Sequence, residues 1–224
     1  MLSNKKAVIF DLDGSLVDSM WVWEEVDKIF MTKYNITPPD DYHKSIEGMS
    51  YTETAQYFID TFPTLNLTVD KIKDIWTEMT IKLYSQDVNL KEGAFEFLET
   101  MRRNGVLLGI ATSNSRELVD AVLNSLRIPH YFSSIRTSCE VCAGKPAPDV
   151  YLKVAEDLNV RPQNCLVFED VPKGILAGKN AGMAVCAVYD DYSHNQDHEK
   201  KRLADYFIYN YYDIKNNTFE TCGF

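Results

Sequence analysis

Short apolar runs that end abruptly at polar residues restrict the fold of this sequence more than any other feature. The first run occupies residues 7–10, and Asp11 ends it. An uninterrupted apolar run of this length is typical of a strand that is buried on both faces of a sheet. Similar runs recur at residues 106–111, 166–168 and 184–188, with a weaker one at 134–136.

Stripes of apolar residues at helical spacing separate these runs. They cover residues 94–101, 118–126 and 150–158, and Pro172 suits the first turn of a fourth helix. Because strands and helices alternate, we predict an α/β fold with a doubly wound, mostly parallel, Rossmann-like core. Near the end of the chain, an aromatic run at residues 206–209 predicts one edge strand.

The stretch from residue 15 to residue 87 interrupts this alternation. It contains helical stripes and no convincing strand, and two proline sites, at residues 38–39 and 62–63, divide it into separate helices. The first apolar stripe of this stretch consists of Trp21, Val22, Val26, Ile29 and Phe30.

We therefore expect two domains. An all-helical cap domain would occupy residues 16–87, inserted into an α/β core made of residues 1–15 and 88–224. Ligands of doubly wound sheets bind beyond the carboxyl ends of the strands, so the cap would lie over the site. The two connections, residues 15–17 and 86–88, would form a hinge.

An excess of acidic residues limits the partners of this chain. It has 33 Asp and Glu residues against 23 Lys and Arg residues, which gives a net charge of −10. An acidic surface repels nucleic-acid backbones and anionic lipid, so we expect neither nucleic acid nor a membrane as a partner. An anionic small molecule would need a local cation or a metal to hold it.

The cysteines and the short apolar runs bear on the compartment. The longest apolar run, residues 183–189, is far too short for a membrane span, and the N-terminus is too polar for a signal peptide. Five scattered cysteines do not suggest a disulfide framework. We expect a reduced, cytoplasmic, soluble monomer. Cys139 and Cys142 form a lone C-x-x-C whose role, if any, stays open.

Acidic residues directly follow two of the apolar runs. Asp11 and Asp13 follow the first, and Glu169 and Asp170 follow the run at 166–168. Such carboxylates are usually solvated or cap helices, but the ends of neighbouring parallel strands would bring these together. Unpaired carboxylates in one place repel one another, which implies a bound cation. Hard oxygen ligands in an open site suit Mg²⁺.

Two further sites carry groups that could hold an anion. Lys145 lies in a turn that two prolines hold rigid, which indicates that its ammonium group points toward the site and is not simply a solubilising surface charge. Thr112 and Ser113 follow the run at 106–111. Hydroxyl and backbone N–H groups there could bind a phosphate oxygen, although helix capping would also explain them.

As a set, these residues resemble the motifs of a known family, the haloacid dehalogenase-like hydrolase superfamily. Its four motifs are similar, in order, to Asp11-x-Asp13-Gly-Ser, Thr112, Lys145 and Glu169-Asp170. The segments at 144–151 and 167–170 resemble its branch of β-phosphoglucomutase-like phosphatases with a helical cap. The resemblance covers residues 6–188 and is specific as a set, although each motif alone would be weak.

The resemblance implies a Mg²⁺-dependent phosphatase of small phosphorylated metabolites that resemble sugar phosphates, working through an aspartyl-phosphate. Asp11 would attack phosphorus, and Asp13 would act as general acid and then as general base. The phosphate-binding residues would be Thr112, Ser113 and Lys145. The Mg²⁺ ligands would be Asp11, Asp13 through its backbone carbonyl, and Asp170, with Glu169 close by.

Alternative activities fit the residues less well. A dehalogenase of the superfamily needs no metal, so Asp13 and Asp170 argue for phosphoryl transfer, and a binding module would not need the whole set. A sugar phosphomutase of the β-phosphoglucomutase type is the main alternative. Such mutases are expected to carry an Arg and a His where this chain has Tyr51 and Trp23, which favours hydrolysis.

Contacts to the rest of the substrate are expected from the cap and from the turn after Thr112. The tryptophans among the candidates could equally pack in the core of the cap. The cap candidates are Trp21, Trp23, Glu47 and Tyr51, and the core candidates are Asn114 and Arg116.

Overall fold

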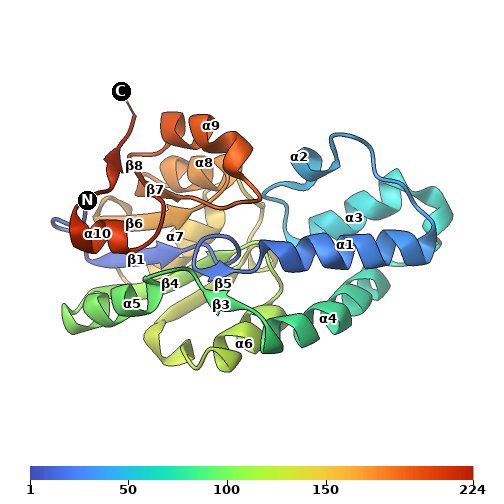
Figure 1. Cartoon of the computed structure of the whole chain (residues 1–224), viewed down its shortest axis with the longest axis horizontal. Helices are drawn as coiled ribbons and strands as arrows, with labels where there is room; N and C mark the ends of the chain where they lie inside the picture. The colour runs from blue at the N-terminus through green and yellow to red at the C-terminus, as the bar shows by residue number, and fades with distance from the viewer. Residues whose placement is uncertain (224) are drawn as a thin grey trace.

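A seven-stranded sheet forms the centre of the molecule (Figure 1). The computed structural model describes residues 1–223, without the side chains of Ser85 and Gln86. Neighbouring strands run parallel except in the last pair. In spatial order the strands are β5 (Ser134–Thr137), β4 (Leu107–Thr112), β1 (Ala7–Phe10), β6 (Cys165–Glu169), β7 (Ala184–Val188), β8 (Tyr206–Ile208) and β9 (Glu220–Thr221).

The prediction of an edge strand at residues 206–209 is wrong in one respect. β8 pairs with β7 on one side and antiparallel with β9 on the other, so β9 takes the edge. A strand of two residues is too short to show a hydrophobic period, and the sequence pattern therefore misses β9.

Helices cover both faces of the sheet, and the side chains of β1 alternate between the two layers. Val8 and Phe10 belong to one hydrophobic cluster with α5 (Ala94–Arg103) and α6 (Arg116–Ser125). Ala7 and Ile9 belong to the other, with α7 (Asp149–Asp157) and α8 (Pro172–Asn180). This arrangement confirms the doubly wound α/β core. The remaining core helices are α9 (Asp197–Leu203) and α10 (Tyr212–Asn216).

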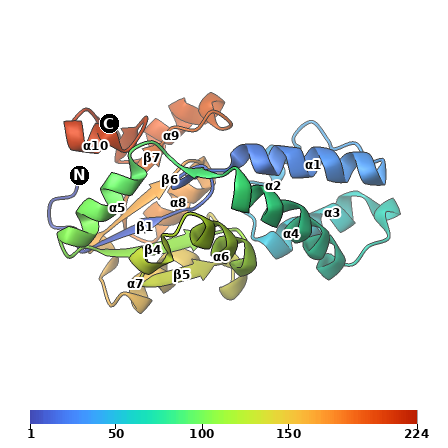
Figure 2. The same ribbon diagram turned by 60° about the horizontal axis from the view of Figure 1, so that its bottom comes forward.

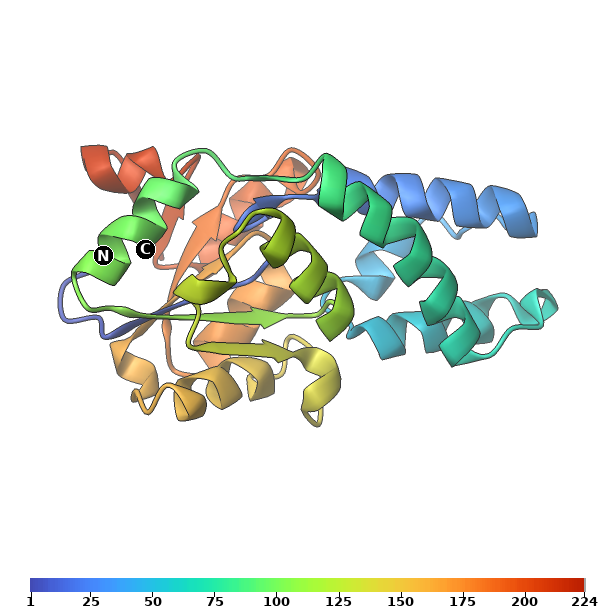
Figure 3. The same cartoon turned by 90° about the horizontal axis from the view of Figure 1, so that it is seen from below.

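Four helices form a second group beside the core (Figures 2 and 3). Aromatic rings hold it together, since Trp76 meets Phe58 at a centroid distance of 5.0 Å and Phe30 at 5.7 Å. A reciprocal capping box between Ser50 and Glu53 begins the third helix. The four helices are α1 (Met20–Tyr34), α2 (Tyr42–Ile46), α3 (Tyr51–Thr61) and α4 (Val69–Gln86).

Two details of the helical insert depart from the sequence-based expectations. A strand was not expected there, but β2 (Val17–Asp18) pairs antiparallel with β3 (Asn89–Leu90). The two connections between the groups therefore lie side by side, through backbone pairing that no local pattern reveals. Ile29 of the predicted apolar stripe is 44% exposed because it lies on the outer side of α1, whereas Val26 and Phe30 are buried.

Short 3₁₀ helices complete the connections. Among the described residues, none of the helices is both long enough and apolar enough to cross a bilayer. The 3₁₀ helices are η1 (Pro63–Leu65), η2 (Pro129–Tyr131), η3 (Ser138–Glu140), η4 (Pro162–Asn164) and η5 (His194–Gln196).

Candidate active site

The carboxyl ends of β1, β4 and β6 open into a cavity of about 460 Å³ that is also lined by the helical insert. Parallel strands end at the same edge of a sheet, so motifs that lie far apart in the sequence meet there. The predicted site residues that line this cavity are Asp11, Asp13, Trp23, Glu47, Tyr51, Thr112, Ser113, Asn114, Lys145, Glu169 and Asp170.

A buried lysine joins two of the carboxylates. Lys145 Nζ lies 2.5 Å from Asp11 Oδ1 and 2.6 Å from Glu169 Oε1. Burial alone would lower the pKa of Lys145, but the charges of Asp11 and Glu169 raise it above its usual value. The ammonium group therefore stays charged at the end of β1, beside the predicted nucleophile.

Both oxygens of Glu169 already have partners. Oε1 accepts a hydrogen bond from Tyr151 at 2.9 Å in addition to that from Lys145. Oε2 accepts from the backbone N–H groups of Asp170 at 2.9 Å and Val171 at 3.3 Å. This bonding suits Glu169 to holding Lys145 in place.

Asp170 differs from its neighbour because one of its oxygens has no partner. Ser15 donates a hydrogen bond to Oδ1 at 3.1 Å, while Oδ2 is buried without a partner among the described residues. Gly14 lies against this oxygen with a φ of +77°, and a Cβ there would come within 2.3 Å of it. The space beside Oδ2 therefore depends on glycine at this turn.

The carboxylates fit a hard divalent cation. Asp11, Glu169 and Asp170 each offer an oxygen within 4.8 Å of the others. Burial raises the pKa of Asp11 and of Asp170 well above the usual range, and the charge of Glu169 adds to both shifts. Buried carboxylates that crowd together are costly unless a cation offsets their charge. An orphaned oxygen in such a group matches the oxygen ligands that Mg²⁺ prefers.

Three donors hold the carboxylate of Asp13. Ser19 Oγ donates to Oδ1 at 2.5 Å, Tyr84 donates to the same oxygen, and Asn114 Nδ2 donates to Oδ2 at 2.9 Å. Burial, and then the Asp13 carboxylate, raise the pKa of Tyr84, so its hydroxyl remains a donor. No sequence motif marks Ser19 or Tyr84 as a contact of Asp13. A tyrosine among the apolar residues of α4 is the signal that could have indicated Tyr84.

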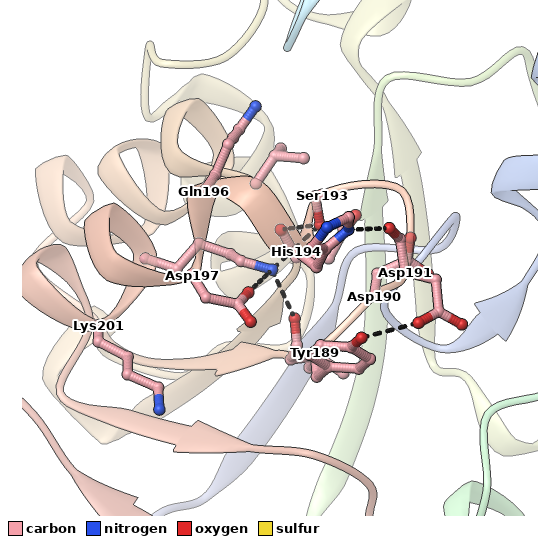
Figure 4. Close-up of polar contacts among 12 residues, drawn as sticks. Tyr189, Asp190, Asp191, Ser193, His194, Gln196, Asp197 and Lys201 are labelled. Carbon is pink, nitrogen blue, oxygen red and sulfur yellow. Dashed lines mark hydrogen bonds and ion pairs between the residues drawn. The ribbon is translucent and has the colours of Figure 1, made fainter.

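The segment after β7, whose polar side chains Figure 4 shows, supports the backbone of Asp170. Ser193 Oγ donates to the backbone carbonyl of Asp170 at 2.9 Å. The ammonium group of Lys200, which is fully buried, donates to Ser193 Oγ at 3.0 Å and pairs with Asp197 at 2.6 Å. Nothing in the polar pattern of this segment predicts that role.

Two of the predicted phosphate-binding residues, Thr112 and Ser113, have different contacts. Thr112 is buried at the end of β4, and its Oγ1 accepts from the backbone N–H of Asn114 at 3.1 Å. Ser113 Oγ donates to the carbonyl of Gly48 at 3.3 Å and so joins the core to the helical insert. Gly48 has a φ of +76°, and a Cβ there would lie 2.8 Å from the carbonyl oxygen of Lys145.

Three of the predicted cap contacts reach the cavity. Trp23, Tyr51 and Glu47 line it, and Glu47 accepts hydrogen bonds from a backbone N–H of α8 and from a glutamine of the β7–α9 segment. Trp21 and Arg116 are not among the lining residues. The guanidinium group of Arg116 pairs with an aspartate of its own helix at 3.1 Å, and the Trp21 indole N–H donates to a backbone carbonyl at 3.2 Å.

Comparisons with known proteins agree with this geometry. A family model described as haloacid dehalogenase-like hydrolase matches residues 8–188. The phosphorylated carbohydrates phosphatase of Thermotoga maritima is 30% identical over 178 residues, covering 80% of this chain and 82% of the relative. Hexitol phosphatase A of Escherichia coli is 30% identical over 185 residues, covering 82% of each chain. The solved structure of β-phosphoglucomutase from Clostridium difficile has a TM-score of 0.77 at 23% identity, covering 95% of this chain and 96% of that one.

A doubly wound core with a lysine and clustered carboxylates at its strand ends defines a class of hydrolytic enzymes. The chain belongs to the haloacid dehalogenase-like hydrolase family, in the branch of β-phosphoglucomutase-like phosphatases. Within that branch it is a phosphoric monoester hydrolase.

Proposed function

We propose that this chain is a Mg²⁺-dependent phosphatase of small phosphorylated metabolites that resemble sugar phosphates, acting through an aspartyl-phosphate on Asp11. One observation carries the proposal. A charged Lys145 binds the Asp11 carboxylate in the same buried cluster as the partnerless oxygen of Asp170. Such a site offers a nucleophile, a fixed cation and a carboxylate oxygen that a metal ion can bind.

In the first step, Asp11 attacks phosphorus, and the new oxygen–phosphorus bond forms as the ester bond breaks. Asp13 gives its proton to the leaving alkoxide, which departs as the alcohol. Asn114 and Tyr84 hold Asp13 in position for this transfer. Lys145 and Thr112 hold the phosphoryl oxygens, on which charge accumulates in the transition state.

In the second step, Asp13 takes a proton from a water molecule. The water oxygen bonds to phosphorus as the bond to Asp11 breaks, and inorganic phosphate leaves. Mg²⁺, when held by Asp11, Asp170 and the backbone carbonyl of Asp13, offsets the negative charges of nucleophile and ester. Glu169 keeps Lys145 oriented throughout, since both of its oxygens are engaged in holding this corner together.

Hydrolysis is favoured over transfer between sugar hydroxyls. A mutase must bind a second phosphate, which calls for a second cation. Among the described residues that line the cavity, Lys145 is the only lysine or arginine. Trp23 and Tyr51 occupy the positions where a mutase would carry its His and Arg. The names of the relatives, a phosphorylated carbohydrates phosphatase and a hexitol phosphatase, also support a phosphatase.

The proposal includes a movable cap at residues 16–87. The paired strands β2 and β3 connect it to the core, and Lys91 of the returning strand segment donates its backbone N–H to Leu16 at 2.9 Å. Closure would exclude bulk water from the first step, and opening would admit the water of the second. A cavity of about 460 Å³ suits a small molecule.

Metal dependence tests the proposal most directly. The purified chain is incubated with p-nitrophenyl phosphate and a panel of sugar monophosphates, in EDTA and then with Mg²⁺ restored. We expect phosphate release to vanish in the chelator and to return with Mg²⁺, and trapping with acid should reveal phosphate on Asp11. Full activity in EDTA, or no phosphate release from any ester, would refute the proposal.

A further inference from the structure

The half of the cavity formed by the helical insert is acidic and aromatic. Its acidic lining residues are Glu24, Asp27 and Glu47. Within the described part of the chain, His43 is the one basic side chain of the insert that lines the cavity, and no lysine or arginine of the insert does. Trp23, with Tyr51 beside it at a ring distance of 6.1 Å, supplies an aromatic wall. The end of the cavity away from the phosphate site therefore has a negative potential.

A buried donor in this half has no partner in the protein. Trp76 lines the cavity and is only 3% exposed, yet its indole N–H makes no hydrogen bond among the described residues. A buried donor without a partner costs free energy, and a ligand that supplies an acceptor removes that cost.

Asp27 provides an acceptor in the same half. Its Oδ2 accepts a hydrogen bond from Tyr42 at 3.0 Å, which fixes the carboxyl group at the cavity wall. Burial raises the pKa of Asp27 to about 7, so the group carries its charge above neutral pH, where a hydroxyl or an ammonium group can bond to it.

We propose that this half is a subsite for the leaving group of the ester, selecting alcohols that carry hydroxyl or ammonium groups and no second anionic group. The proposal rests on the proposed phosphatase activity and defines its substrate class. Trp76 offers a donor and Asp27 an acceptor, and the hydroxyl groups of a leaving alcohol can bond to either. A second phosphate or a carboxylate would meet Glu24, Asp27 and Glu47 without a counter-charge.

Matched hexose derivatives test this selection. Glucose 6-phosphate, glucosamine 6-phosphate and 6-phosphogluconate carry, respectively, no further charge, an added cation and an added anion. With Mg²⁺ at about pH 8, we expect kcat/KM for 6-phosphogluconate to be at least about 10-fold below that for glucose 6-phosphate, from repulsion by nearby carboxylates. Glucosamine 6-phosphate should equal or exceed glucose 6-phosphate. If the anionic ester is hydrolysed as well as the neutral one, the inference is wrong.

Two variants assign the selection to this subsite. Asp27→Asn keeps the size of the side chain and should narrow the preference for glucose 6-phosphate over 6-phosphogluconate at least threefold. Glu25→Gln is the matched control, because it removes one charge from the same helix at a side chain that is 45% exposed and does not line the cavity. Equal effects of the two variants would show bulk electrostatics and overturn the inference.

Trp76→Phe removes the indole N–H and keeps an aromatic ring. It should raise KM for glucose 6-phosphate more than KM for p-nitrophenyl phosphate, whose leaving group has no hydroxyl to accept from it. Equal changes in the two constants would contradict the role given to Trp76. The same assays separate the two proposals: if neither p-nitrophenyl phosphate nor any hexose ester is hydrolysed, the proposed function fails, whereas hydrolysis without discrimination among the hexose esters defeats only the subsite.

Discussion

The two halves of the cavity differ in how tightly their polar groups are held. In the core half, ion pairs and hydrogen bonds of 3.3 Å or less hold the buried Lys145 and Glu169. In the cap half, several aromatic rings line the wall, and the buried indole N–H of Trp76 has no hydrogen-bond partner among the described residues.

This difference separates reaction from recognition. The groups that we assign to phosphoryl transfer follow strands of the central sheet, apart from Lys145, which lies in the loop before α7 and bonds to Asp11 and Glu169. The cap half leaves the Trp76 indole N–H without a partner among the described residues, where a substrate can supply an acceptor, whereas the unpaired oxygen of the core half, Asp170 Oδ2, suits a metal ion. Changes in the core half should therefore alter the rate of reaction, and changes in the cap half should alter which ester is accepted.

The largest effect is expected for Asp11→Asn, which removes the nucleophile and leaves the shape of the core half intact. Turnover should fall by about 10⁴-fold or more, because an amide oxygen does not form the acyl phosphate. Rapid-quench trapping should find no phosphoenzyme, and circular dichroism should report an intact fold. Phosphoenzyme formed by this variant would place the nucleophile elsewhere.

The next largest effect is expected for Asp13→Asn, at about 10²–10⁴-fold in kcat, the usual range for lost acid–base catalysis. Formation of the phosphoenzyme should be less impaired for p-nitrophenyl phosphate than for an alkyl phosphate, because nitrophenolate leaves without a proton. Pre-steady-state kinetics with both esters measures this. Losses of equal size for the two leaving groups in that step would contradict the acid role.

Tyr84→Phe tests whether the cap half takes part in the reaction. Tyr84 belongs to α4 of the helical insert and donates to the Asp13 carboxylate, so this residue of the cap half contacts a group that we assign to the reaction. A hydrogen bond to a charged group contributes about 1.5–3 kcal/mol, so kcat should fall by about 10-fold or more. KM should change little, and the pH–rate profile should shift.

Tyr57→Phe is the control for that experiment. Tyr57 is a tyrosine of α3 in the same helical group, and it does not line the cavity. A Tyr84→Phe variant that matched this control in kcat would limit Tyr84 to packing.

The smallest effect concerns the stability of the cap half. The pKa of Asp27 is about 7 in the folded protein, because of burial, with the Tyr42 hydrogen bond opposing the shift. An unfolded aspartate titrates near 3.9, so the folded state holds the proton more tightly. The stabilisation that this proton supplies is complete below about pH 4 and is lost as the pH rises through about 7.

Urea unfolding between about pH 5 and pH 8 measures this loss. The wild type should lose up to about 1 kcal/mol per pH unit up to pH 7 relative to Asp27→Asn, which has no proton to lose. Parallel stability curves for the two proteins would show that Asp27 titrates normally and would contradict this prediction.

Helices and strands with a repeating apolar pattern could be predicted from the sequence, and single tertiary contacts could not. The apolar run at β1 and the stripe of α5 repeat over several residues, so each predicts a buried element. β9 is too short to repeat, and its pairing with β8 comes from tertiary contact alone. Cys165 and Cys186 are buried, whereas Cys139 and Cys142 are exposed and no metal-ligating group among the described residues includes them.

The same distinction holds for the predicted contacts to the substrate. Trp23 and Tyr51 line the cavity, as expected, whereas Trp21 of the predicted apolar stripe does not. Arg116 does not, because the first turn of α6 directs its guanidinium group to an aspartate on the same helix. A helical period predicts a side of the helix, and a long flexible side chain can still choose another partner.

The chain order alone therefore indicates the chemistry that we propose: two aspartates and an acidic pair follow buried strands, and a lysine lies in a proline-bounded turn before a helix. Local sequence can encode this because each motif is short. Which residues support these motifs depends on the folded chain. Three supporting residues, Ser193, Lys200 and Tyr84, reach the site from distant segments. That the Trp76 indole N–H has no hydrogen-bond partner among the described residues also depends on the folded helical insert, because burial and hydrogen bonding are properties of packing.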